Sequence, residues 1–124
     1  MDLKADDLHT WLDGASDAEL EALSFGVIGI DADGNVCRYS EHEARMAGLS
    51  REHVLGRPFF SEIARCMDNS MVAGRIDTAI AAGESLDLSF DYVFALRSRV
   101  VPVKLRLLVD PDSPIHYLLV HRHS

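Results

Sequence analysis

Three side chains have types and a spacing that could do chemistry together: Tyr39, Glu43 and Cys66. Tyr39 ends a predicted strand and Glu43 follows four residues later, so both side chains can point into one space if a helix begins at Ser40 or Glu41. Such a pair would form the polar part of a pocket. Cys66 adds a thiol, for which the neighbouring sequence offers neither metal-site spacing nor a base.

Each of these residues also has an ordinary structural interpretation. An inward tyrosine commonly belongs to the core with its hydroxyl at the rim, and a glutamate such as Glu43 is commonly solvated. A lone cysteine after an aromatic segment commonly packs as a small apolar side chain. Cys37 alternates onto the same strand face as Tyr39, so we expect it to lie near the pocket in a structural role.

An enzymatic function has little support in the sequence. A nucleophilic Cys66 would need a base, and no histidine has an obvious path to it. The chain carries no Walker motif, G-x-G-x-x-G, nucleophile elbow or H-E-x-x-H. The segment DADGN lacks the spacing of a calcium loop, and His121 and His123 at a strand end are a weak metal pair. We expect neither catalysis nor a metal site.

The composition of the chain narrows the classes of protein to which it can belong. The chain has 124 residues, 48% hydrophobic and 26% charged, which predicts one compact domain spanning 1–124. Its net charge of −8 argues against nucleic-acid binding. No apolar run approaches the roughly 20 residues that span a bilayer, and the acidic N-terminus does not resemble a secretory signal. We therefore expect a cytoplasmic protein, without a membrane partner, that is a monomer or a weak dimer.

The first 24 residues predict an N-terminal helical cap. Leu8, Trp11 and Leu12 share one helical face, and that helix ends at Gly14. The segment Ser16-Asp-Ala-Glu19 is a capping box that begins a second short helix. We expect this cap, 1–24, to be lightly attached to a core domain that spans 25–124.

The core domain alternates between strand and helix patterns. A β-hairpin around Asp33-Gly34 is followed by short helices that stop at Gly48 and begin at Ser50. After Cys66, a longer helix ends at Gly83. Its predicted inner stripe consists of Val72, Ile76, Ala79 and Ile80.

Three further strands complete the prediction. LDLSFDYVFAL alternates cleanly, with one face formed by Leu86, Leu88, Phe90, Tyr92, Phe94 and Leu96. VVPVKLRLLVD and IHYLLVHRH follow, joined by the turn DPDSP. The order predicts an α+β domain: a five-stranded antiparallel sheet with helices on one face and the N-terminal helical cap. Such a sheet with a helix-lined pocket is typical of sensors, although fold alone does not assign function.

The run LSFGVIGIDADGNVCRYSEHEARMAGLSREHVLGRPFFSEIARC resembles the photoactive yellow proteins, bacterial blue-light receptors of the PAS fold. The match covers nearly the whole chain. Its shared positions include Phe25, Gly26, Tyr39, Glu43, Gly48, Val54, Gly56, Phe59, Phe60, Ala64, Cys66, Gly74, Gly83, Phe90, Tyr92, Phe94, Pro102, Lys104 and Val120. Generic PAS domains do not share a tyrosine, a glutamate and a cysteine at these separations, so the resemblance is specific.

The resemblance implies a covalent chromophore, p-coumaric acid (4-hydroxycinnamic acid), joined to Cys66 by a thioester. Tyr39 and Glu43 would then donate hydrogen bonds to its phenolate, because a buried phenolate needs charge-assisted donors. Glu43 can donate only when it is protonated. The remaining chromophore-binding residues implied are Ala47, Leu49, Phe60, Ala64, Arg65, Met67 and Phe94.

The resemblance also implies a mechanism. Light isomerises the chromophore from trans to cis, Glu43 passes its proton to the phenolate, and a buried carboxylate without a counter-charge remains. That electrostatic cost would release the N-terminal cap and expose a surface to a downstream signalling protein whose identity the sequence does not give. The alternative is a non-photoactive PAS module for small-ligand sensing or protein–protein interaction.

Several positions depart from the family. Leu49 stands where an arginine usually shields the pocket, Ala47 replaces a threonine that hydrogen-bonds to the tyrosine, and Arg65 precedes the cysteine where proline is common. The loop 95–101 lacks the methionine that assists dark recovery, so we expect slow return to the dark state. The candidates to replace the arginine that usually shields the pocket are Arg65, Arg97 and Arg99.

Overall fold

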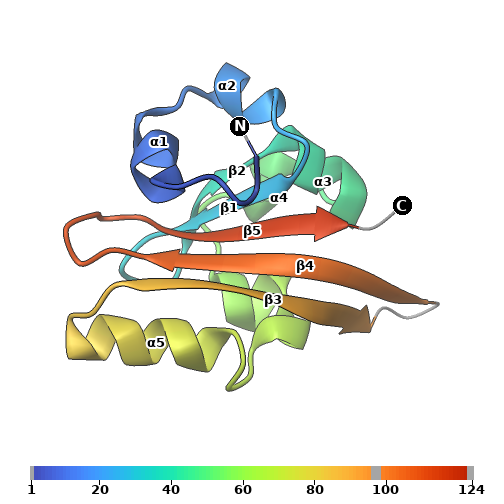
Figure 1. Cartoon of the computed structure of the whole chain (residues 1–124). Helices are drawn as coiled ribbons and strands as arrows, with labels where there is room; N and C mark the ends of the chain where they lie inside the picture. The colour runs from blue at the N-terminus through green and yellow to red at the C-terminus, as the bar shows by residue number, and fades with distance from the viewer. Residues whose placement is uncertain (1, 96–98, 123–124) are drawn as a thin grey trace.

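The computed structural model describes residues 2–95 and 99–122. Within these ranges the strands form a five-stranded sheet in the order β2-β1-β5-β4-β3, and each neighbouring pair is antiparallel (Figure 1). The strands are β1 (Gly26–Ile30), β2 (Val36–Tyr39), β3 (Leu86–Ala95), β4 (Val100–Val109) and β5 (His116–Arg122). The predicted antiparallel sheet and α+β class are confirmed.

Helices form where local signals predict them. They are α1 (Leu8–Gly14), α2 (Asp17–Glu21), α3 (Glu41–Ala47), α4 (Arg51–Val54) and α5 (Ala73–Ala82), with a π-helical turn η1 (Phe59–Ile63) and a 3-10 turn η2 (Arg65–Met67). The capping box of Ser16 and Glu19 is present, with both of its hydrogen bonds. The helices α3 and α5 end at Gly48 and Gly83, whose φ angles of 72° and 65° suit glycine.

Both faces of the sheet are covered, because strand side chains alternate between two apolar cores. On β5, Leu118 packs in the core under α3, α4 and α5, whereas its neighbour Leu119 packs in the core under the cap. The helices after β2 therefore share one face, as predicted, and the cap occupies the opposite face. Ile80 does not join the predicted stripe of α5: it is 42% exposed because Ala79 already occupies the inward position beside it.

The hairpin of β1 and β2 forms as predicted, with Gly34 at φ 83° in its turn. However, the prediction that Cys37 faces the pocket with Tyr39 is wrong, since Cys37 is exposed. The register passes from Gly29 opposite Arg38 to Ile30 opposite Val36, so Cys37 is the extra residue of a β-bulge. A bulge interrupts the period-2 alternation on which the prediction relied.

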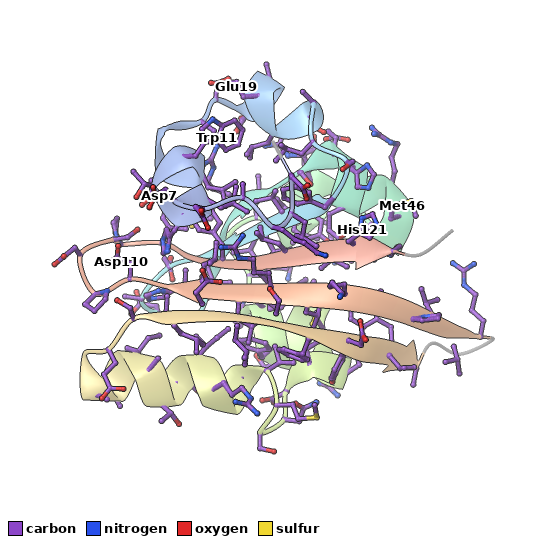
Figure 2. All side chains as sticks on the ribbon, in the orientation of Figure 1. Asp7, Trp11, Glu19, Met46, Asp110 and His121 are labelled. Carbon is purple, nitrogen blue, oxygen red and sulfur yellow. The ribbon has the colours of Figure 1, made fainter. Side chains whose placement is uncertain are left out.

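The cap packs firmly on the sheet. Leu8, Leu12 and Leu20 are at most 2% exposed in the core under the cap. Trp11, labelled in Figure 2, is partly buried against the same core. The expectation that the cap is only lightly attached to the core domain is therefore wrong, because the apolar side chains of the cap are buried against the sheet. Such burial contributes about 25 cal/mol for each Å² of apolar surface removed from water.

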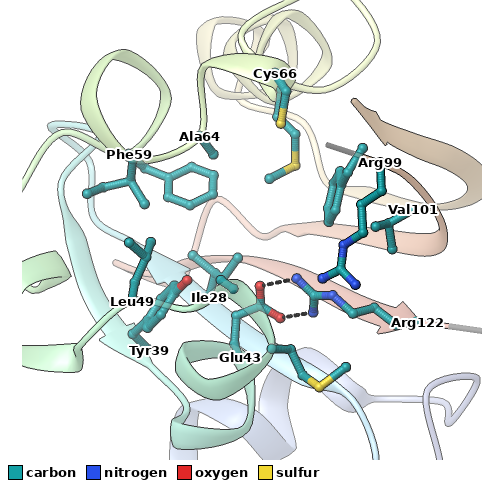
Figure 3. A pocket seen from close by; sticks show the side chains of 15 residues that line it. Ile28, Tyr39, Glu43, Leu49, Phe59, Ala64, Cys66, Arg99, Val101 and Arg122 are labelled. Atoms are coloured by element: carbon teal, nitrogen blue, oxygen red, sulfur yellow. Dashed lines mark hydrogen bonds and ion pairs between the residues drawn. The ribbon is translucent and has the colours of Figure 1, made fainter. Parts of the chain in front are cut away.

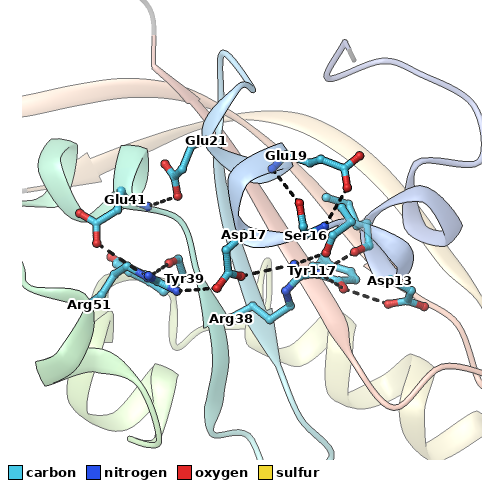
Figure 4. Close-up of polar contacts among 12 residues, drawn as sticks. Asp13, Ser16, Asp17, Glu19, Glu21, Arg38, Tyr39, Glu41, Arg51 and Tyr117 are labelled. Carbon is cyan, nitrogen blue, oxygen red and sulfur yellow. Dashed lines mark hydrogen bonds and ion pairs between the residues drawn. The ribbon is translucent and has the colours of Figure 1, made fainter.

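Two arginines of the sheet also tie the cap down. Arg38 donates to the carbonyl oxygens of Leu12 at 2.5 Å and Ala15 at 2.7 Å, and Arg106 donates to that of Leu3 at 2.8 Å. These hydrogen bonds join the cap to β2 and β4, and the Leu12 carbonyl also accepts the backbone N–H of Ala15 at 3.1 Å. Further contacts at this interface are drawn in Figure 4, among them the ion pair of Arg38 with Asp17 at 3.8 Å.

His116, the first residue of β5, is a buried titratable side chain. It is 7% exposed, and its Nδ1 has no hydrogen-bond partner within the described chain. Burial lowers the pKa of His116 below its ordinary 6.5, nearby His9 adds to the effect, and Asp13 opposes it. Below that ordinary value the unfolded chain binds a proton that the folded chain does not bind.

We therefore expect the free energy of unfolding to fall as the pH drops below about 6.5. Urea unfolding at pH about 7.5 and about 5.5 measures this change. The variant His116→Gln, which cannot take up the proton, should lose less stability between the two values than the wild type. Equal losses in the two proteins would show that His116 is not responsible.

Candidate functional site

A cavity of about 290 Å³ lies between the turn that carries Cys66 and the start of α3 (Figure 3). Its size is at the lower end of the range for small-molecule pockets. The described residues that line it are Ile28, Tyr39, Glu43, Met46, Ala47, Leu49, Phe59, Ile63, Ala64, Cys66, Met67, Phe94, Arg99, Val101 and Arg122. The wall is thus largely apolar, with polar groups gathered around Glu43.

Cys66 lies on the 3-10 turn η2, and its backbone is fixed from β3 and from the following loop. Its carbonyl oxygen accepts hydrogen bonds from the Tyr92 hydroxyl at 2.7 Å and from the Asn69 side-chain amide at 3.1 Å. The Asn69 amide also lies 2.6 Å from the Tyr92 hydroxyl. This network holds the turn so that the thiol reaches the cavity.

The Cys66 thiol is neutral at ordinary pH. Partial burial raises the pKa of Cys66, while a hydrogen bond from its own backbone opposes this shift. No histidine is among the described residues that line the cavity, and its carboxylate, Glu43, is paired with Arg122. In the described part of the chain, no three histidine, cysteine, aspartate or glutamate side chains gather as metal ligands.

The four-residue spacing of Tyr39 and Glu43 brings both side chains into the cavity, as predicted. Ser40 follows β2 and caps α3: its hydroxyl accepts the backbone N–H of Glu43 at 3.2 Å and that of Val27 at 3.1 Å. Tyr39 is 2% exposed. Burial raises the pKa of Tyr39, the neighbouring Glu43 raises it further and Arg122 opposes them, so its hydroxyl keeps its proton and can donate.

Glu43 is paired with Arg122, the last residue of β5. Two hydrogen bonds join the guanidinium to the two carboxylate oxygens, at 2.6 and 2.9 Å, and the side chains are only 4% and 13% exposed. Arg122 is thus a counter-charge for Glu43 that the sequence analysis did not foresee. Arg122 also lies over the ring of Phe94, 5.6 Å from its centroid.

The backbone of β1 leaves room for this ion pair only because residue 26 is glycine. A Cβ atom at Gly26 would collide with the Glu43 carboxylate. Glu43 is consequently held between β1, α3 and the end of β5. A larger side chain at position 26 would displace Glu43 from Arg122.

The structure brings most of the predicted pocket residues together. In the described chain, those that line the cavity are Tyr39, Glu43, Ala47, Leu49, Ala64, Cys66, Met67 and Phe94. Phe60 and Arg65 are not among the described lining residues, and their contact with a chromophore stays a prediction. The π-helical turn puts Phe59 into the wall and packs Phe60 against the core behind it. Arg65 is exposed and donates to the Ser61 carbonyl at 2.9 Å.

Sequence reasoning missed Arg122, although the sequence carried a signal for it. Residues 118, 120 and 122 alternate onto one strand face, and Leu118 and Val120 are core residues. An arginine on that face needs a buried partner. Of the arginines expected to replace the one that usually shields the pocket, Arg99 lines the cavity, whereas Arg97 lies outside the described residues. Leu96, predicted on the inner face of the third strand, lies outside them too.

Residues 16–123 match the family described as the PAS fold. The chain is therefore a PAS domain. Photoactive yellow proteins from Rhodothalassium salexigens and Halochromatium salexigens are 32% and 34% identical to it, covering 94% and 95% of the chain and 93% and 94% of the relatives.

A solved structure points the same way. The photoactive yellow protein domain of the sensor histidine kinase Ppr from Rhodospirillum centenum has 33% identity and a TM-score of 0.82, over 90% of this chain and 97% of that one. The chain belongs to the photoactive yellow protein family, as its sequence predicted. No helix in the described ranges has the length and apolar character needed to cross a membrane.

The ion pair should dominate the stability of the unloaded protein. We expect Glu43→Leu to lower the free energy of unfolding by about 3–5 kcal/mol, because it leaves a mostly buried guanidinium unpaired. The double variant Glu43→Leu/Arg122→Leu should recover much of that loss. Urea unfolding measures both values.

The exposed pair of Asp91 and Lys104, 3.6 Å apart, provides the control. Asp91→Asn should change the free energy of unfolding by at most about 1 kcal/mol. A cost for Glu43→Leu no larger than this would contradict the role given to the buried pair.

Proposed function

We propose that the protein is a blue-light photoreceptor that carries p-coumaric acid as a thioester on Cys66. The observation that carries the proposal is one cavity with the Cys66 thiol on one wall and the Tyr39 hydroxyl with the Glu43–Arg122 pair on another (Figure 3). When bound, the chromophore supplies light absorption and trans–cis isomerisation. Membership of the photoactive yellow protein family supports this reading.

The residues present suit this group. The apolar walls from Phe59, Phe94 and Leu49 can hold an aromatic ring, and the neutral Tyr39 hydroxyl offers an O–H to a phenolate oxygen. The departures at Ala47 and Leu49 remove polar groups without blocking the cavity that both residues line. Donation of a proton by Glu43 would require its protonated form, whereas in the unloaded protein both of its carboxyl oxygens accept hydrogen bonds from Arg122.

A contact between the cap and α3 offers a path for the signal. The carboxylate of Glu21, at the end of α2, accepts the backbone N–H groups of Glu41 at 2.8 Å and His42 at 3.2 Å (Figure 4). These are first-turn amides of the helix that carries Glu43. A displacement of α3 when the pocket rearranges would pull its N-terminus away from Glu21 and loosen the cap from that side.

Attachment is tested by intact mass and visible spectroscopy after activated p-coumaric acid is added to the unloaded protein. Wild type should gain one coumaroyl group and a yellow band that bleaches under blue light. Cys66→Ala should gain neither, whereas Cys37→Ala, which removes the exposed thiol of the bulge, should behave as wild type. A colourless wild type without an adduct would favour the alternative, a PAS module for another small ligand or for protein contact.

The signalling path is tested by hydrogen exchange of the loaded protein in the dark and under blue light. Amides of residues 8–21 should exchange faster in the light. Glu21→Ala should speed their exchange already in the dark and shrink the light-induced difference, and Glu52→Ala on exposed α4 is the matched control. If light changes exchange in α3 and leaves the cap unchanged, release of the cap is refuted.

A further inference from the structure

A second cavity lies where the N-terminal segment of the cap meets β4 and β5. Its volume is about 280 Å³, and the described residues that line it are Asp2, Leu3, Lys4, Ser24, Lys104 and His121. Lys4 and Lys104 are the only two lysines of the chain. They come from opposite ends of the sequence, so the fold gathers positive charge here in a protein whose net charge is −8.

The strand register places Lys104 and His121 together on the face of the sheet that the cap covers. Lys104 lies directly opposite His121 in the pairing of β4 with β5 (His121 is labelled in Figure 2). Its neighbours Val103 and Leu105 belong to the core on the other face, so Lys104 points toward the cap side. Cationic groups directly opposite each other on two strands repel when His121 is protonated, and an anion between them would remove that repulsion.

Arg106, two residues further along the same face of β4, holds the backbone around Lys4. Its guanidinium donates to the carbonyl oxygens of Leu3 and Ala5, both at 2.8 Å, and it forms two hydrogen bonds with the Asp87 carboxylate. The residues on both sides of Lys4 are therefore fixed to the sheet, and Lys4 lines the cavity. A donor that is already in place lowers the ordering cost of binding a ligand.

The second cavity has more positive than negative charge. Lys4 and Lys104 carry one positive charge each and Asp2 carries one negative charge, which leaves one positive charge, and protonation of His121 adds another. Within the described chain the Lys4 ammonium makes no ion pair, and Lys104 lies 3.6 Å from Asp91, whose side chain is 81% exposed. Such an exposed pair is weak, so Lys104 can turn to a ligand.

We propose that the second cavity binds a small oxyanion of the phosphate type, held by Lys4 of the cap and by Lys104 and His121 of the sheet. The donors suit such an ion, because each ammonium offers three N–H groups and the Ser24 hydroxyl offers one O–H. Charge-assisted hydrogen bonds of this kind are the strong ones. The volume suits a free ion or a compact phosphate monoester.

The donors come from both sides of the interface between cap and sheet, so the bound ion bridges the two. Lys4 belongs to the N-terminal segment, and Leu3 beside it packs in the core under the cap. A ligand that binds only the docked arrangement stabilises that arrangement by mass action. The oxyanion thus holds the cap on the sheet. This inference goes beyond the proposed function, because it involves no group bound at Cys66.

The first test is a titration of unloaded, isotope-labelled protein with inorganic phosphate, followed by the NMR signals of the backbone amides. Sodium chloride keeps the ionic strength constant, because salt screens exposed charges. We expect saturable shifts at residues 2–5, at Lys104 and at His121. Lys4→Gln and Lys104→Gln should each weaken binding about fivefold, the upper value for an exposed ion pair.

Two variants serve as controls for the titration. Lys104→Arg keeps the positive charge and should bind phosphate nearly as the wild type does. Arg75→Gln removes a positive charge from the exposed side of α5, on the other face of the sheet, and should leave binding unchanged. Circular dichroism confirms that each variant is folded. Shifts that do not saturate, or that are equal in wild type and Lys4→Gln/Lys104→Gln, would overturn the inference.

The second test measures hydrogen exchange of the unloaded protein with and without phosphate. At a phosphate concentration ten times the Kd, amides of residues 8–21 that exchange when the cap undocks should exchange about tenfold more slowly. In Lys104→Gln, whose binding is fivefold weaker, the same concentration should slow them only about threefold. Saturable binding that leaves the exchange of the cap unchanged would refute the bridge.

Sedimentation with vesicles separates a free ion from a lipid headgroup as the ligand. The net charge of −8 disfavours a negatively charged membrane surface, so the protein should stay in solution with vesicles of phosphatidylcholine and phosphatidic acid. Vesicle binding that Lys4→Gln/Lys104→Gln abolishes would overturn the assignment to a free ion. If Cys66 forms no thioester, the proposed function fails and this inference stands, because none of its tests uses loaded protein.

Discussion

Glu43 is buried where β1, α3 and the end of β5 meet, and its charge cannot lie there without a partner. That constraint fixes several other features of the fold. Position 26 must be glycine, Ser40 must begin α3 in the register that turns residue 43 inward, and β5 must extend as far as Arg122. The ion pair of Glu43 and Arg122 therefore holds β1, α3 and the end of β5 together, and the cavity lies beside it.

The same corner links the two faces of the sheet. Ser40 accepts backbone N–H groups from Val27, on the cap side of β1, and from Glu43, on the pocket side. Glu21 of the cap meets the first turn of the same helix. Because α3 is only seven residues long, a shift of its inner end moves its N-terminus as well. The cap is thus joined to α3 by specific polar contacts as well as to the sheet by apolar packing.

Local features of this chain could be predicted from the sequence, and long-range partners could not. The capping box at Ser16, the glycine stop at Gly48 and the four-residue step from Tyr39 to Glu43 each depend on neighbours in sequence, and the structure has all three. By contrast, Arg122 meets Glu43 across 79 positions of sequence. Only the pairing of β1 with β5 brings them together, and no spacing encodes that contact.

Two other differences from the predictions have local geometry as their cause. The bulge at Cys37 adds one residue to β2, which reverses the face assigned to it by simple alternation. The π-helical turn at Phe59 widens the helical period, so Phe59 enters the cavity wall while Phe60 packs behind it. Bulges and π-helical turns lack a dependable sequence signal, and both are common beside functional sites.

The charge balance of the cavity depends on the same pair. A protonated Glu43 would signal by losing its proton, which leaves an unpaired buried charge. In the structure, Glu43 already has Arg122 as its partner, so its own charge is compensated whether or not a ligand oxygen is near. The same pair joins α3 to the end of β5. At its N-terminus, α3 meets the cap through the carboxylate of Glu21.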